Sequence, residues 1–212
     1  MSVYQELALA GIEASIPSLH SSSLDGHTVI MHGINFSQPL IYTEDVRYTI
    51  ETTVILDTEA VGSWKVTKVA SATHEDMETH AHGSFLIQPS SKTVLKFSTV
   101  HPVISLRVTS IISRSDNKIF TTSSIYEVFF PRIVKYSKDY HVIQTLTIYT
   151  EGYATIQLPD TLNIQHDRFV FHPVLMDVIL QVAGFIGSVY GALGHAFICS
   201  KVTLAEVYAR VP

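Results

Sequence analysis

The sequence contains a single cysteine, Cys199, so it has no second thiol for an intramolecular disulfide. One cysteine in 212 residues is typical of proteins from a reducing compartment, and we expect a cytoplasmic location. Charged residues are also scarce, at 16%, and 19 acidic side chains outnumber 14 basic ones. A chain with this charge lacks the basic surface that nucleic-acid-binding proteins use, so no nucleic-acid partner is expected.

Long uncharged hydrophobic runs are also missing. Residues 174–193 are the one stretch with the length and apolar character of a membrane span. Asp177 and Gln181 interrupt it, and an intramembrane carboxylate is costly. The N-terminal residues do not have the basic segment and apolar core of a secretory signal. We therefore expect neither membrane insertion nor secretion.

A well-packed globular core is expected, because 46% of the residues are hydrophobic. Within the apolar stretch, His172-Pro173 is followed by apolar residues at helical spacing, and proline is tolerated in the first turn of a helix. Asp177 and Gln181 are four residues apart and therefore share a face of this helix. A carboxylate is costly to bury unless it is paired or used. Asp177 is thus either a solvent-facing residue or a candidate functional acid.

The remaining pattern is one helix followed by several antiparallel strands, which predicts an α+β fold. The first helix is predicted over Ser2–Ser15. A short helix capped by Thr122 or Ser123 is predicted up to Phe130, with a kink at Pro131. Strands are predicted over residues 27–42, 47–56, 63–72, 83–88, 144–149 and 152–158, with one or two more in 195–211.

Residues 73–82 have three histidines, His74, His80 and His82, among three acidic side chains. Imidazole and carboxylate groups can bind zinc, but this spacing matches no standard zinc site. The competing interpretation is a strand that carries His80 and His82 on one face. We expect no metal here.

Residues 172–185, HPVLMDVILQVAGF, resemble a signature of the dehydratase and product-template domains of polyketide synthases. That signature is HPxxxD, followed one turn later by Gln or His. Residues 183–186 and 196–202 resemble most the product-template branch of fungal non-reducing synthases, whereas Gln181 is more similar to dehydratases. The resemblance implies a double hot-dog fold, in which antiparallel sheets wrap around long central helices.

The resemblance implies two halves, residues 1–89 and 119–212, joined by a connection at 90–118. In the first half, Tyr4 and Glu6 match a Tyr-x-Glu run of the family's helix. The family's catalytic histidine lies upstream of that helix, in a GHxVxGxxxxP stretch. Gly26-His27-Thr28-Val29 is superficially similar to it, but it follows the helix, and Gly33 and Pro39 are at the wrong offsets. We therefore expect an incomplete double hot dog, truncated at both ends.

In this family, a histidine from the first half and an aspartate from the second act on a chain carried by an acyl carrier protein. They remove water or direct aldol cyclisation of a poly-β-keto chain, without cofactor or metal. The resemblance assigns the acidic role to Asp177 and the adjacent polar role to Gln181. The implied partners are the carrier-bound intermediate and the polyketide synthase chain.

Three hypotheses remain open without the upstream histidine. The chain is an inactive fragment, or an enzyme that recruits His27, His32 or His80 as its base. Alternatively, it is a non-catalytic scaffolding piece that pairs with another synthase chain through exposed sheet edges. The sequence does not decide whether the chain is itself an enzyme.

Overall fold

The computed structural model describes residues 2–16, 26–39, 48–69, 77–158, 169–191 and 198–208. The chain divides into two compact units, each of which combines segments distant in sequence. The first unit comprises Met1–Val94, Phe169–Pro173 and Cys199–Pro212. The second comprises Leu95–Arg168 and Val174–Ile198.

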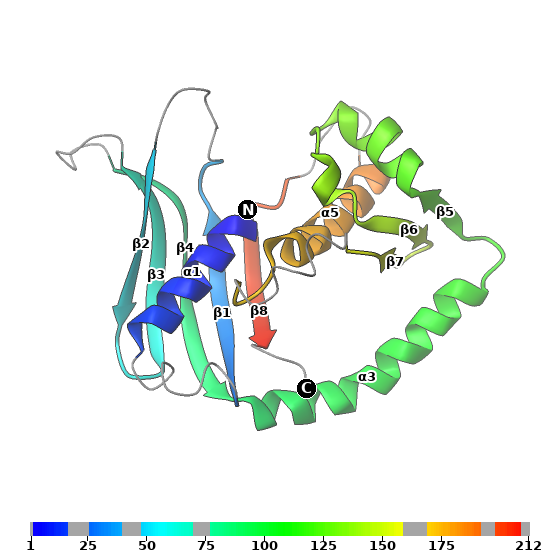
Figure 1. Cartoon of the computed structure of the whole chain (residues 1–212). Helices are drawn as coiled ribbons and strands as arrows, with labels where there is room; N and C mark the ends of the chain where they lie inside the picture. Colours follow the sequence, from blue (N-terminus) through cyan, green and yellow to red (C-terminus); the bar gives the residue numbers. More distant parts are fainter. Residues whose placement is uncertain are drawn as a thin grey trace. The chain divides into compact units, whose positions relative to one another are not determined.

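The first unit is a five-stranded antiparallel sheet with one helix, α1 (Ser2–Ser15), packed against β2 and β3 (Figure 1). The strand order is β2-β3-β4-β1-β8. The strands are β1 (His27–Phe36), β2 (Thr49–Leu56), β3 (Val61–Val69), β4 (Met77–Pro89) and β8 (Lys201–Tyr208).

Alternation along these strands builds the core of the first unit, because successive side chains of a strand point to opposite faces. Trp64 and Val66 of β3 pair with Gly83 and Ala81 of β4, so all four lie on one face of the sheet. Gly11 of α1 approaches that face closely, since a Cβ atom there would lie 3.0 Å from Thr52 Cγ2. Because Gly11 has no side chain, α1 can approach β2 closely.

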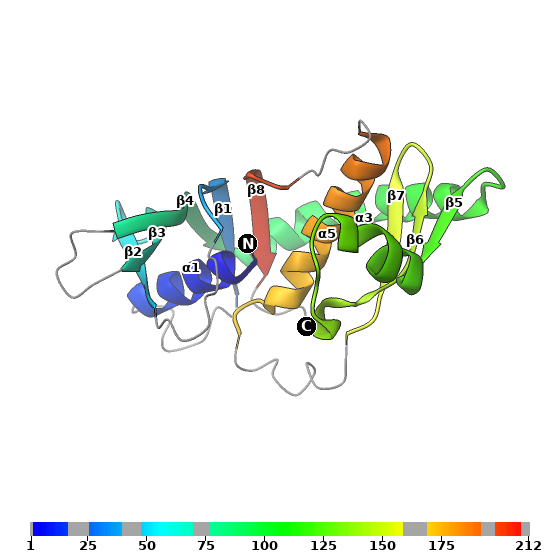
Figure 2. The same ribbon diagram turned by 90° about the horizontal axis from the view of Figure 1, so that it is seen from above.

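The second unit is a three-stranded antiparallel sheet, β5-β6-β7, with α5 (Pro173–Tyr190) beside it (Figure 2). Val174, Val178 and Phe185 of α5 share a buried cluster with Leu146 and Ile148 of β6. The strands are β5 (Lys118–Thr121), β6 (Ile143–Ile148) and β7 (Gly152–Ile156). Short helical turns connect β5 to β6: η1 (Ser124–Phe129), η2 (Phe130–Arg132) and η3 (Lys138–Tyr140).

Both predicted long helices are present, with α1 at its predicted bounds and Pro173 as the first residue of α5. By length and composition α5 is also the one described helix that passes as a candidate membrane span. The predicted mixed α+β fold with antiparallel sheets is confirmed.

Two local predictions differ from the structure. Residues 90–118, expected as a connection, contain the 24-residue helix α3 (Ser90–Ser113). The predicted cap is wrong, because Ser123 makes no side-chain capping bond and Thr122 Oγ1 instead donates to the Ile143 carbonyl at 3.0 Å. The strand predicted within residues 195–211 is present as β8, which pairs with β1. The division into halves at 1–89 and 119–212 stays a prediction.

Candidate functional site

Asp177 and Gln181 lie on one face of α5, as their spacing predicted. Gln181 Nε2 donates a hydrogen bond to Asp177 Oδ2 at 2.8 Å. The Gln181 side chain is only 1% exposed, whereas Asp177 is half-buried. Asp177 is therefore not a fully solvated residue, and one of its oxygens is held by a buried amide.

Tyr126 fixes the orientation of that amide. Its hydroxyl donates to Gln181 Oε1 at 2.6 Å, so the oxygen of the amide faces the tyrosine and the nitrogen faces Asp177. The backbone N–H of Ile143 in turn donates to the Tyr126 oxygen at 3.3 Å. A chain of hydrogen bonds therefore runs from β6 through η1 to the carboxylate of Asp177.

The tyrosine of this network, Tyr126, and two neighbouring tyrosines, Tyr136 and Tyr140, are held in the neutral form. Burial, opposed in part by hydrogen bonds from the Ile143 and Val142 backbone, raises the pKa of Tyr126 to about 12. Burial also raises the pKa of Tyr136 and of Tyr140, and the negative charge of Asp177 adds to both shifts. These hydroxyls consequently remain protonated near neutral pH.

An imidazole completes the aromatic surroundings of Tyr126. The ring of His141 stacks on the Tyr126 ring, with centroids 4.2 Å apart and an angle of 9° between planes. Its Nε2 lies 3.2 Å from the Tyr136 carbonyl oxygen. The sequence placed Tyr126 in an aromatic segment but did not link it to Gln181. Nothing in the sequence pointed to His141 except that it directly follows Tyr140.

The three histidines proposed as alternative bases lie in the first unit, in different surroundings. His80 is 2% exposed, its ring stacks on Tyr4 at 5.8 Å, and its Nδ1 lies 3.1 Å from the Gln38 carbonyl oxygen. His32 of β1 is exposed, and His27 at the start of β1 is half-buried. His80 is thus held by packing, while His32 is accessible.

The structure brings no metal-binding group together within the ranges it describes. His80 and His82 both lie in β4, as the strand alternative predicted. They do not share one face, because the β3–β4 register shifts at His80, which is buried while His82 is exposed. His74 lies outside the described residues.

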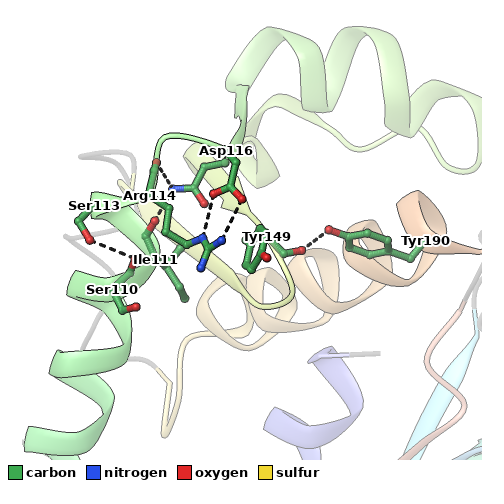
Figure 3. A network of polar contacts seen from close by, with 8 residues as sticks. Ser110, Ile111, Ser113, Arg114, Asp116, Tyr149 and Tyr190 are labelled. Atoms are coloured by element: carbon green, nitrogen blue, oxygen red, sulfur yellow. Dashed lines mark hydrogen bonds and ion pairs between the residues drawn. The ribbon is translucent and has the colours of Figure 1, made fainter.

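A separate polar network joins the end of α3 to the β6–β7 turn and to α5 (Figure 3). Arg114 forms a bidentate pair with Asp116 at 2.9 Å, and its guanidinium lies 3.6 Å from the Tyr149 ring centre. The Tyr190 hydroxyl donates to the Tyr149 carbonyl. The Arg114–Asp116 pair is exposed, and exposed ion pairs contribute little to stability, so we expect this network to add little to the free energy of unfolding.

No family model matches the chain. It is 41% identical over 208 residues to orsellinic acid synthase ArmB of Armillaria ostoyae, and 40% identical to the Armillaria mellea protein. Each match covers 95% of this chain and 9% of the synthase, so the chain corresponds to a small part of those relatives.

Solved structures of dehydratase domains share the fold. A trans-AT PKS dehydratase domain from Brevibacillus brevis superposes with a TM-score of 0.73 at 15% identity, covering 96% of this chain and 66% of that one. The dehydratase domain from the CurF module of curacin polyketide synthase gives 0.71 at 15% identity, with coverage of 96% and 66%. These comparisons confirm the predicted hot-dog architecture, and they give no support to the scaffolding alternative.

Proposed function

We propose that this chain acts on a carrier-bound poly-β-keto chain. The proposal is supported by its similarity to part of the orsellinic acid synthases and by the fold that it shares with polyketide synthase dehydratase domains. The geometry that supports this proposal is the Tyr126–Gln181–Asp177 network. It holds one carboxylate in a defined orientation at the edge of a buried aromatic cluster. Such preorganisation is the usual basis of acid–base chemistry on enolisable carbonyl compounds.

In an aldol cyclisation, a base removes a proton from the carbon between two carbonyl groups. The carbanion attacks a ketone further along the chain, a carbon–carbon bond forms, and the new alkoxide takes a proton. Loss of this hydroxyl as water, with a second α-proton, then gives the double bond that leads to an aromatic ring. We assign to Asp177 the proton transfer at the substrate oxygen, which is first the new alkoxide and then the hydroxyl that leaves as water. Gln181 holds Asp177 in place.

A simple dehydration uses the same groups. The base removes the α-proton of a β-hydroxyacyl chain, and the β-hydroxyl leaves as water with a proton from the acid. We favour cyclisation for this chain because the curated relatives are named for orsellinic acid, an aromatic acid. Product-template chemistry is therefore proposed ahead of dehydration alone.

The base is the second requirement, and the chain offers histidines for it. His32 is the accessible candidate, while His80 is packed against Tyr4 and held by the Gln38 carbonyl. His27 is intermediate between them. Substitution of each by Phe, measured with the same thioester substrate, distinguishes a base supplied by this chain from one supplied elsewhere in the synthase.

The partners follow from the proposed reaction. A poly-β-keto chain is reactive and is kept on an acyl carrier protein, so the carrier and the polyketide synthase chain are the proposed partners. The proposed location is the cytoplasm, and the proposed chemistry needs no cofactor.

Asp177→Asn tests the proposal. The variant keeps the size of the side chain but cannot exchange a proton, so turnover of an N-acetylcysteamine thioester of a poly-β-keto or β-hydroxy acid should fall at least about 100-fold. Asp57→Asn, at an exposed acid of the first unit, is the control and should leave turnover unchanged. Equal activity of Asp177→Asn and the parent protein would remove Asp177 from the mechanism.

A further inference from the structure

Glu6 of α1 is a buried carboxylate with two backbone donors. Its side chain is 8% exposed. Oε1 accepts the N–H of Val170 and Oε2 accepts the N–H of Phe171, each at 2.9 Å. One carboxylate thus binds two consecutive peptide groups that are more than 160 residues away in sequence. Hydrogen bonds to an ionised acceptor are about twice as strong as neutral ones.

Burial of the Glu6 carboxylate at this position carries a desolvation cost. Burial is the largest influence on Glu6 and raises its pKa, while the bonds from Phe171 and Val170 oppose that shift and the charge of Glu13 adds to it. A residue kept only to fill space would be apolar or a neutral amide, since these carry no charge desolvation cost. The pair of N–H donors is therefore the reason that a carboxylate stands here.

The bound segment has an unusual place in the chain. Phe169–Pro173 belongs to the first unit, whereas the residues before and after it belong to the second. His172 is buried, and its ring contacts the Phe169 ring with centroids 5.0 Å apart. Pro173 is the first residue of α5, and Asp177 follows four residues later. The Glu6 bonds thus act on the peptide groups directly before the helix that carries Asp177.

We propose that Glu6 is a positioning residue, which clamps the Val170–Phe171 backbone to α1 and so fixes the point from which α5 begins. Its two oxygens hold two successive peptide planes, which leaves this segment little freedom to rotate. The clamped segment ends at Pro173, the first residue of the helix that carries Asp177. The role in catalysis rests on the function proposed above; the clamp itself does not.

The number of acceptors makes the clamp testable by amide hydrogen exchange of the full chain. Glu6→Gln has the same size but offers one acceptor oxygen, and its NH₂ group faces the other N–H. We expect exchange to accelerate at least about 10-fold at one of Val170 and Phe171 and at both in Glu6→Ala. Glu13→Gln on the same helix is the control and should change neither amide.

The exchange experiment distinguishes a clamp from a space-filling role of Glu6. A space-filling role predicts that Glu6→Gln behaves as the parent protein, and unchanged protection of both amides in that variant would overturn the clamp. If Glu6→Ala fails to fold, the isosteric Glu6→Gln variant still distinguishes the clamp from a space-filling role, because it preserves packing.

Turnover of the thioester substrate tests the positioning role. A displacement of catalytic groups by about 1 Å can cost up to about 100-fold in rate. We expect Glu6→Gln to lower kcat about 10-fold with little change in KM, and Glu13→Gln to change neither. Loss of amide protection with normal kcat, in a protein that Asp177→Asn inactivates, would refute the positioning role. An active Asp177→Asn variant would instead refute the proposed function, and amide exchange would still decide the clamp.

Discussion

Gln181 holds Asp177 through a 2.8 Å hydrogen bond between side chains one helical turn apart. The amide would be free to present either its oxygen or its nitrogen if α5 stood alone. Tyr126 removes that freedom, because its hydroxyl proton requires the amide oxygen. The acid of the candidate site is consequently oriented by a residue from a different part of the chain, and the stability of the site should depend on this arrangement.

Replacing Gln181 by Leu should destabilise the protein. The change leaves the Tyr126 hydroxyl without its acceptor in a buried place and removes the donor to Asp177. A buried group that loses its partner costs about 1–3 kcal/mol. Urea denaturation followed by circular dichroism measures this, and Gln144→Leu at an exposed position of β6 controls for the exchange itself. Equal stability of the two variants would contradict the assigned bond.

Tyr126→Phe removes the hydroxyl and preserves the ring stacked on His141. We expect a loss of about 1–3 kcal/mol in the free energy of unfolding, because Gln181 Oε1 and the Ile143 N–H both lose a partner. The double variant with Gln181→Leu should cost less than the sum of the single changes, since the two residues share one bond. Strict additivity would show that they act independently. Tyr153→Phe in β7 serves as the control.

Phe185→Ala should be the most destabilising of these changes. Phe185 is fully buried, and its ring lies 4.2 Å from that of Phe129 and 5.0 Å from that of Phe120. Truncation of a buried Phe costs about 3–5 kcal/mol. Ile179→Ala on the exposed side of the same helix should change stability by less than about 0.5 kcal/mol. A small loss at Phe185 would mean that the cluster of the second unit is not packed as described.

Glu6 should make stability depend on pH in a defined direction. Burial raises its pKa in the folded protein above the ordinary value of 4.5, so the folded state binds the proton more tightly than the unfolded chain. Its contribution is therefore fully present below about pH 4.5 and is lost as pH rises through the raised folded pKa.

The same titration can be isolated by comparison with Glu6→Gln, which cannot ionise. Between about pH 4 and pH 7, the free energy of unfolding of the parent protein should fall relative to that of the variant. The difference between the two curves cancels groups that titrate alike in both proteins. A difference that rises with pH would show that the two N–H bonds outweigh burial and that folding lowers the pKa of Glu6 instead.

Helices and strands whose residues follow a regular local periodicity could be predicted from the sequence. Helical spacing predicted α5 and the shared face of Asp177 and Gln181, and alternation predicted β2 and β6 closely. Helix α3 was missed because Ser and Thr are weak helix formers and Pro102 lies inside it.

The partners of the site residues could not be predicted in the same way. Tyr126 is 55 residues from Gln181, and no spacing rule joins them. Glu6 is 164 residues from Val170, and only the folded chain brings a carboxylate of the first helix to that peptide group. The residue proposed to carry the chemistry, Asp177, was therefore easier to find than the distant partners that orient the candidate site.

The pairing of β1 with β8 has a consequence for synthesis on the ribosome. Thr28 lies opposite Tyr208, so one edge of β1 has no neighbouring strand until residues 201–208 have been synthesised. Non-local strand pairing is slow, and an open strand edge invites association with other nascent chains. We expect removal of β8 to leave this edge of β1 open and to increase aggregation of the protein.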